Sequence, residues 1–323
     1  MQTARTNPEG KTNITKAGLI LKSQKRFNFS KYWQLYALML LPIIYFIIFK
    51  YIPMFGNILA FRKHRPGLSP FGTDWVGFRY FEMFMKDPAF WRAFKNSFSL
   101  AIINLAVNFP VPIIFALLLN EITSVKYKKL VQTVTYMPRF VSTVVVISMV
   151  MEILSPSTGI LNQYLKLWFG IEPIFFVNEP QYFRIIYILT DTWQYTGWTA
   201  IVYLAAITGI SSELYEAAMI DGANRWQQTR YVTLPSIMST IMVMFIMKVG
   251  YLLSLGFEKV LLLYTPKNSV VSDIIDTFVY RVGLVQSNYS YSTAVGLFGG
   301  IVGVVLVVSA NKISRSLTGE SLF

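Results

Sequence analysis

The sequence predicts an all-α integral membrane protein with about six transmembrane helices. Hydrophobic residues make up 54% of the 323 residues and charged residues only 14%, whereas an average soluble protein has roughly 25% charged residues. The chain also contains six apolar runs, each long enough to cross a hydrocarbon core of about 30 Å as a helix. Because lipid offers no hydrogen bonds to a backbone amide, these runs must be helices rather than strands.

A basic N-terminal tail, residues 1–31, precedes one transmembrane region, residues 32–323. The predicted spans lie at about residues 33–49, 98–119, 136–154, 185–210, 237–263 and 293–310. The first span is followed by Lys50, Tyr51 and Ile52 rather than by the small residues of a cleavage site, so we expect a signal anchor instead of a cleaved signal peptide. The region between the first two spans is expected to form short amphipathic pieces at the outer membrane surface.

Charge predicts that both termini lie in the cytoplasm. The N-terminal tail holds seven Lys and Arg residues against one Glu, and such clusters mark the cytoplasmic side. The loop after the second span agrees, because it carries Lys126, Lys128 and Lys129. The predicted outer loop, residues 50–97, disagrees with its eight basic residues; the tail has more weight because the first helix usually dominates orientation. The net charge of +13 suits anionic lipid headgroups better than nucleic acid.

Residue types and motifs argue against an enzyme. The chain has no Cys, which excludes disulfides, thiolate zinc sites and a Cys nucleophile. The single histidine, His64, lies in a basic loop and is expected to be solvated. The sequence contains no GxxxxGK[ST], HExxH or GxSxG motif, and the acids Glu152 and Asp191 are far apart. We therefore expect no catalytic residue, no metal site and no cofactor in this chain.

The second predicted cytoplasmic loop, residues 211–235, is the most informative segment. Its candidate functional residues are Glu216, Ala217, Ala218, Asp221, Gly222, Leu234 and Pro235. Glu and Ala favour helix, Gly222 permits a turn that a side chain would obstruct, and Pro235 suits the first turn of the next span. We expect a short helix, a bend and a second short helix. The alanines would pack closely into a groove of a partner, with Glu216 paired to an arginine there; a solvated connector is the alternative.

This loop resembles the EAA loop of permeases from ATP-binding cassette (ABC) importers, on three features. These are Glu216-Ala217-Ala218, Gly222 six positions after Glu216, and Leu234-Pro235 at the end. The stretch EAAMIDGANRWQQTRYVTLP is similar to the carbohydrate-uptake branch in particular. The resemblance extends from about residue 30 to 310, through IFKYIPMFGNILAFRK, LLLNEI, VQTVTYMPRFVSTVVV and YSYSTAVGLFGG. Arg139 departs from it, since a histidine is expected after the Met-Pro pair.

The resemblance implies a permease subunit of the bacterial plasma (inner) membrane. The EAA loop would then be a coupling helix in a groove of a cytoplasmic ATPase, with Glu216 in a salt bridge, Gly222 at the bend and Asp221 capping it. Two separate ATPase subunits would bind ATP and Mg and drive rocking of the membrane helices. One coupling loop per chain implies a second, related permease subunit, as a heterodimer. An extracytoplasmic solute-binding protein would deliver the substrate.

Polar and aromatic residues in the fourth and fifth spans are predicted to line a substrate path. They are Trp193, Gln194, Tyr195, Trp198, Lys248 and Tyr251. Sugars bind aromatic faces and hydrogen-bonding groups, whereas lipid-facing positions should be aliphatic; helix packing and interfacial anchoring are the alternative. Lys248 lies near the bilayer centre, where a charge costs at least about 2.5–3.5 kcal/mol. It should therefore face a cavity or pair with another charge inside the protein.

Glycines are expected to shape the last two spans. Gly250 and Gly256 would let the fifth span bend or pack closely. The sixth span carries two overlapping GxxxG pairs within residues 296–303, which would let a helix of this chain or of a second subunit approach.

The predicted substrate is an oligosaccharide or polysaccharide. If Lys248 lines the cavity, its charge favours an anionic saccharide built from uronates, such as alginate. Two alternatives stay open: an ABC permease for another solute, such as a peptide or a phosphorylated compound, and a membrane receptor or channel outside the ABC class in which the EAA pattern is accidental.

Overall fold

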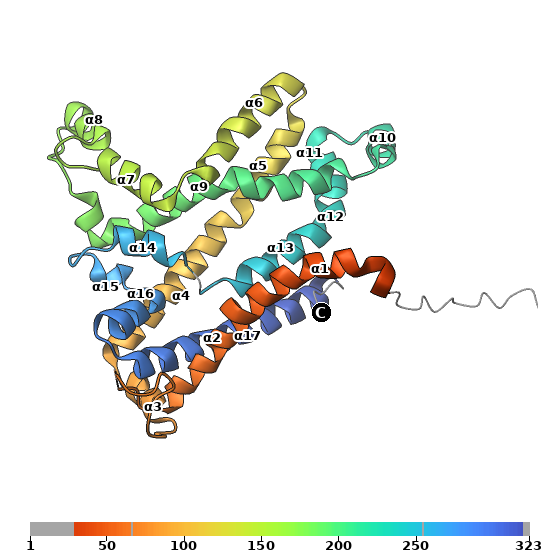
Figure 1. Ribbon diagram of the computed structural model, residues 1–323. Coiled ribbons are helices and arrows are strands. Elements are labelled where there is room, and N and C mark those ends of the chain that lie inside the picture. Colours follow the sequence, from red (N-terminus) through yellow and green to blue (C-terminus); the bar gives the residue numbers. More distant parts are fainter. Residues whose placement is uncertain (1–28, 66, 254, 319–323) are drawn as a thin grey trace, which may run out of the picture. The chain divides into compact units, whose positions relative to one another are not determined.

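The computed structural model describes residues 29–65, 67–253 and 255–318, and this part of the chain is helical without a named strand (Figure 1). The predicted all-α fold is thus confirmed. The chain divides into two units, Met1–Phe55 and Gly56–Phe323. Most of the predicted basic tail, residues 1–31, lies outside the described residues.

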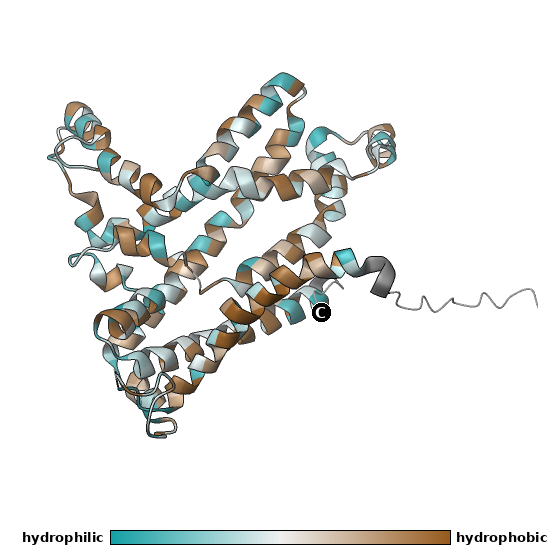
Figure 2. Cartoon of the chain, in the orientation of Figure 1, coloured by the Kyte–Doolittle hydropathy of each residue, from teal (hydrophilic) through white to brown (hydrophobic). Residues whose placement is uncertain are grey.

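The described part of the first unit is a single apolar helical run. Helix α1 (Phe29–Phe46) continues through the π-helical turn η1 (Ile47–Tyr51) into α2 (Ile52–Met54). Its large hydrophobic side chains are exposed from Trp33 onward, and Figure 2 shows hydrophobic residues along α1. A side-chain surface of this kind suits lipid, so the run fits the first predicted span and extends beyond residue 49.

The second unit contains the remaining helices. Their bounds are η2 (Phe55–Phe61), α3 (Arg79–Met85), α4 (Pro88–Asn108), α5 (Pro110–Glu121), α6 (Val125–Tyr136), η3 (Met137–Phe140), α7 (Thr143–Ile153), α8 (Ile160–Phe169), η4 (Phe176–Asn178), α9 (Pro180–Thr208), α10 (Ser212–Ile220), α11 (Arg225–Gln228), η5 (Thr229–Thr233), α12 (Leu234–Ser236), α13 (Met238–Gly250), α14 (Phe257–Leu263), α15 (Ser269–Ser272), α16 (Ile275–Tyr280), η6 (Arg281–Val285) and α17 (Tyr289–Thr318).

Two predicted spans are broken where the sequence analysis expected one continuous helix. In the third, 136–154, helices α6 and η3 meet α7 at an angle of 101°. Pro138 cannot donate a backbone hydrogen bond, and the side chain of Ser142 caps α7 by accepting from the Val145 amide at 3.4 Å. In the fifth, 237–263, α13 ends at Gly250 and α14 begins after Gly256, whose φ of +61° is left-handed.

Length and composition support several membrane crossings. Within the described residues, three helical runs are long and apolar enough to span, at Trp33–Phe61, Pro88–Glu121 and Tyr289–Ser316. The number rises to five if each of two bent pairs, one of which ends in α7 and the other in α13, counts as one span. Helix α9 covers most of the fourth predicted span, 185–210, and has 29 residues.

The core of the second unit is built around α9, which packs against α4, α5 and α6 (Figure 1). Gly197 makes the approach to α6 possible, because a Cβ there would lie 2.2 Å from the carbonyl oxygen of Thr135. Helix α13 packs on α17, where a Cβ at Gly250 would lie 3.2 Å from the Val307 side chain. The predicted close packing at Gly250 is thus present, whereas a Cβ at any glycine of the 296–303 pairs would meet no atom within 4 Å in the described structure.

The predicted outer loop, 50–97, is more organised than a set of surface pieces. Ala60, Phe84 and Phe90 are buried in a small core together with residues of α16 and α17. One of its basic residues also has a structural role, because the Arg62 guanidinium donates to the carbonyl oxygens of Phe71 and Thr73. From Gly56 onward the loop is therefore a folded part of the second unit.

Candidate functional site

The loop between α9 and α13 forms the predicted helix, bend and second helix. Helix α10 carries the Glu216–Ala218 motif, and Gly222 follows it with φ +81°. The Gly222 amide donates to the Met219 carbonyl at 3.0 Å, and the Ala223 amide donates to that of Ala218 at 2.8 Å. This pair of bonds is a Schellman motif, which needs a left-handed residue at the position of Gly222. Asp221 precedes the bend at the C-cap of α10.

Local contacts then direct the chain into the next helix. Asn224 and Gln227 form a capping box at α11, which satisfies amides at the start of that helix. Pro235 occupies the first turn of α12, directly after Leu234, and α12 continues from the π-helical turn η5. The Tyr215 hydroxyl lies 2.9 Å from the Thr233 hydroxyl and ties α10 to this return segment.

The loop presents a mixed apolar and acidic surface. Glu216 is exposed, as are Ala217 and Gly222. The large side chains of Ile220 and Trp226 are 87% and 70% exposed. An exposed apolar group of this size on a short, rigid helix is typical of a docking surface.

A second feature is a cavity of about 390 Å³ in the second unit. Its walls come from α4, α7, α9, α13 and α14, and three of the predicted path residues line it: Tyr195, Lys248 and Tyr251. Asn104 and Thr199 add hydrogen-bonding groups to the same wall. The cavity is therefore polar, aromatic and charged, although apolar helices surround it.

One cation at this cavity is neutralised by a buried ion pair. The Lys259 ammonium donates to Asp191 Oδ1 at 2.7 Å. The Oδ2 atom of Asp191 accepts from the side-chain amides of Asn104 at 3.0 Å and Asn108 at 3.2 Å, and Thr192 in turn donates to Asn108. Both carboxylate oxygens of Asp191 thus accept hydrogen bonds, which offsets part of the cost of burying the pair.

Tyr195 lies between two cations. Lys259 Nζ is 4.9 Å from the centre of the Tyr195 ring, and Arg139 Cζ is 5.1 Å from it, both within cation–π range. Lys248 and Glu258 also line the cavity, and neither takes part in an ion pair with any residue that the structure describes. Lys248 is thus the cavity cation available to a ligand, with Glu258 the available anion.

The structure places the other three predicted path residues outside this cavity. Gln194 is buried and donates to the Val141 carbonyl at 3.3 Å. Trp193 and Trp198 are 51% and 44% exposed, and the Trp198 ring contacts Phe140 edge-on. Gln194 and Trp198 thus contact neighbouring parts of the protein rather than this cavity.

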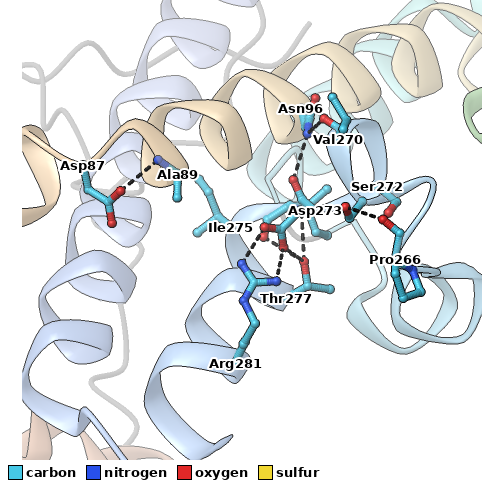
Figure 3. Close-up of polar contacts among 12 residues, drawn as sticks. Asp87, Ala89, Asn96, Pro266, Val270, Ser272, Asp273, Ile275, Thr277 and Arg281 are labelled. Atoms are coloured by element: carbon cyan, nitrogen blue, oxygen red, sulfur yellow. Dashed lines mark hydrogen bonds and ion pairs between the residues drawn. The ribbon is translucent and has the colours of Figure 1, made fainter. Parts of the chain in front are cut away.

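Two polar clusters were not predicted from the sequence: one joins residues far apart along the chain, and the other lies largely within residues 273–281. One is the Asp191–Lys259 pair; a lysine within the apolar run 257–263 was its only local signal. The other is shown in Figure 3: Arg281 forms two bonds to Asp273, at 2.6 and 3.1 Å, and Thr277 donates to the same carboxylate. Asn96 of α4 donates to the Asp273 carbonyl at 3.1 Å, so this cluster fixes α16 against α4.

The residues match one family model over positions 17–318, described as "binding-protein-dependent transport system inner membrane component". The chain belongs to this family of transporter permeases, which are proteins of the inner membrane. The ABC permease resemblance inferred from the EAA loop is confirmed.

Two relatives and one solved structure are similar to this chain over most of its length. The chain is 45% identical over 289 residues to the polygalacturonan/rhamnogalacturonan transport system permease protein YteP of Bacillus subtilis, covering 90% of each chain. It is 43% identical to the protein LplB of the same organism, over 90% of this chain and 91% of LplB. A crystal structure of a bacterial ABC transporter that imports the acidic polysaccharide alginate has a chain that is 42% identical, with a TM-score of 0.83 over 90% of this chain and 98% of that one.

The alginate importer has also been solved in complex with an alginate pentasaccharide-bound periplasmic protein, in a structure 41% identical to this chain over 91% of it and 98% of the solved chain. Its TM-score is again 0.83. The fold seen here is therefore that of a permease chain within a binding-protein-dependent importer.

Proposed function

We propose that this chain is one permease subunit of an ATP-driven importer for acidic oligosaccharides or polysaccharides. The observation that carries this proposal is the cavity, in which Lys248 is available to a ligand while Lys259 is occupied by Asp191. Polygalacturonan and alginate, which appear in the names of the relatives, are both polymers of uronic acids. A uronate presents one carboxylate per sugar, which is a group that a lysine without an ion-pair partner attracts.

The cavity also offers what a sugar ring needs. Tyr195 and Tyr251 provide aromatic faces, and Asn104 and Thr199 provide groups that bond to hydroxyls. A saccharide-binding site combines a mostly apolar wall with a few convergent polar groups. Glu258 on the same wall repels a second carboxylate, which favours one register of a uronate chain over another.

Energy for transport comes, in this proposal, from partner subunits. Helix α10 would seat in a groove of a cytoplasmic ATPase with Glu216 paired to a basic residue there, and two such ATPases would bind ATP and Mg. A second, related permease would supply the other coupling helix. An extracytoplasmic solute-binding protein would deliver the saccharide, and the chain itself would carry no catalytic group and no cofactor.

Uptake by the assembled importer in proteoliposomes tests the substrate. Lys248→Gln should lower uptake of a uronate oligomer by roughly tenfold, which corresponds to about 1.4 kcal/mol, and should change uptake of its carboxyl-reduced, neutral counterpart far less. Lys312→Gln, an equal charge change on an exposed residue of α17, is the matched control. Equal losses for the acidic and the neutral oligomer would refute the acidic-saccharide assignment.

A further inference from the structure

Helix α8 (Ile160–Phe169) carries an exposed apolar face that the transport cycle does not explain. Leu167 and Trp168 are 75% and 70% exposed, and Ile160 and Tyr164 are about half exposed. At 100° per residue these four side chains fall on one side of the helix, whereas Lys166 and Phe169, which is 69% exposed, fall on the other. A water-exposed patch of this kind would be unfavourable for a permanent surface, so something covers it.

Hydrogen bonds on the buried side of α8 fix the orientation of this helix. The side-chain amide of buried Asn162 donates to the carbonyl oxygens of Ser155 and Ile174, at 3.0 and 2.9 Å. Its oxygen accepts from the Ile174 amide at 2.8 Å, so both chain segments that flank α8 are tied to one side of the helix. Gly170, with φ +65°, ends the helix in a left-handed cap. The apolar face is thereby held outward and cannot turn inward.

We propose that α8 lies in the headgroup region of the membrane, with its apolar face against the acyl chains. The first reason is continuity: α7, which precedes it, belongs to a candidate span and exposes Val145, Met149 and Ile153. An apolar surface therefore runs from a lipid-facing helix directly to the connection that leads into α8. The residues between them form a short, bonded turn, in which Thr158 donates to Glu152 at 2.7 Å.

The second reason is the composition of the helix. Tyr164 and Trp168 contact each other, with ring centres 5.2 Å apart, and amphipathic rings of this type gather at the membrane–water boundary. Lys166 lies on the opposite side, where its ammonium would reach lipid phosphates while the apolar face of Ile160, Tyr164, Leu167 and Trp168 stays buried. A short helix with an apolar face and a basic polar side is the usual form of an interfacial anchor.

A soluble solute-binding protein is a poorer occupant of this face. Such a protein associates and dissociates during transport, so the aromatic and aliphatic side chains would stand in water whenever it is absent. The lipid boundary covers them at all times. The inference concerns α8 alone and does not depend on which solute the importer carries.

Spin labels on the assembled importer in nanodiscs of phosphatidylethanolamine and phosphatidylglycerol test the proposal. The chain contains no cysteine, so Tyr164→Cys and Lys166→Cys each give a single labelling site in it. Two residues apart on a helix, they point in nearly opposite directions. Collision with oxygen should exceed collision with a water-soluble nickel chelate several-fold at position 164, and the order should reverse at position 166.

Other results would overturn the proposal. A label at 164 that collides mainly with the nickel chelate places the face in water. A label at 164 that is shielded from both reagents shows that a protein covers it: the second permease if shielding is present from the start, or the binding protein if it appears only after that protein is added.

Discussion

At the scale of single residues, the two lysines that line the cavity differ in whether they have an ion-pair partner. The Lys259 side chain is 4% exposed and its ammonium bonds to Asp191, so its charge is neutralised within the protein. Lys248 reaches the same cavity from α13 and has no such partner among the residues described. Lys248 is predictable from the sequence because it is a charge inside an apolar run, but the sequence does not show whether a distant carboxylate neutralises it.

Breaking the buried pair from one side should be costly. Lys259→Met leaves the Asp191 carboxylate buried without its cation, so we expect a loss of about 3–5 kcal/mol in stability. Changing both partners, Asp191→Asn together with Lys259→Met, should restore most of it because no charge is then left unpaired. Both effects are measured by heating the complex and following the loss of its monodisperse peak by size-exclusion chromatography. A single variant as stable as the double one would contradict the assigned pairing.

At the scale of elements, the sequence predicted the α10–α12 loop more fully than any other part. Its signals are local: Gly222 adopts the left-handed conformation, and Pro235 lies in a first helical turn. The breaks at residues 141–142 and 251–256 were hidden in apolar runs, since hydropathy averages over a window and does not register a single cap such as Ser142. The contact of Asp191 with Lys259 depends on how helices pack, whereas Asp273, Thr277 and Arg281 follow one another at four-residue spacing, a local signal that was overlooked.

The bend after α10 should be necessary for coupling. Gly222→Pro fixes φ near −65°, against the observed +81°, and removes the amide that bonds to Met219. Uptake and substrate-stimulated ATP hydrolysis in proteoliposomes should both fall by roughly tenfold or more, with normal amounts of protein in the membrane. Gly222→Asn, which tolerates the left-handed conformation, should keep most of the activity. Normal coupling in the proline variant would show that the bend is dispensable.

At the scale of the whole molecule, the charges of the chain give two conflicting accounts of its orientation. The tail favours cytoplasmic termini, but the loop 50–97 is equally basic. The structure reduces the conflict, because this loop is folded around Phe84 and Phe90 and uses Arg62 for hydrogen bonds to its own backbone. The positive-inside preference describes short loops that insert as plain chain, so basic residues committed to a folded outer segment weigh less against it.

Site-directed labelling in intact cells, followed by purification of the chain, tests the orientation. The chain has no native cysteine, so each substituted cysteine is its single thiol. Ile220→Cys lies on α10, where the native side chain is 87% exposed. If the loop 211–235 faces the cytoplasm, as we propose, this cysteine should react with a membrane-impermeant maleimide only after the membrane is permeabilised. Lys267→Cys, one predicted span later and also exposed, should react in intact cells. The opposite pattern would put α10 on the outer face, beyond the reach of any ATP-hydrolysing partner, and the coupling role proposed for Glu216 and Gly222 would be wrong.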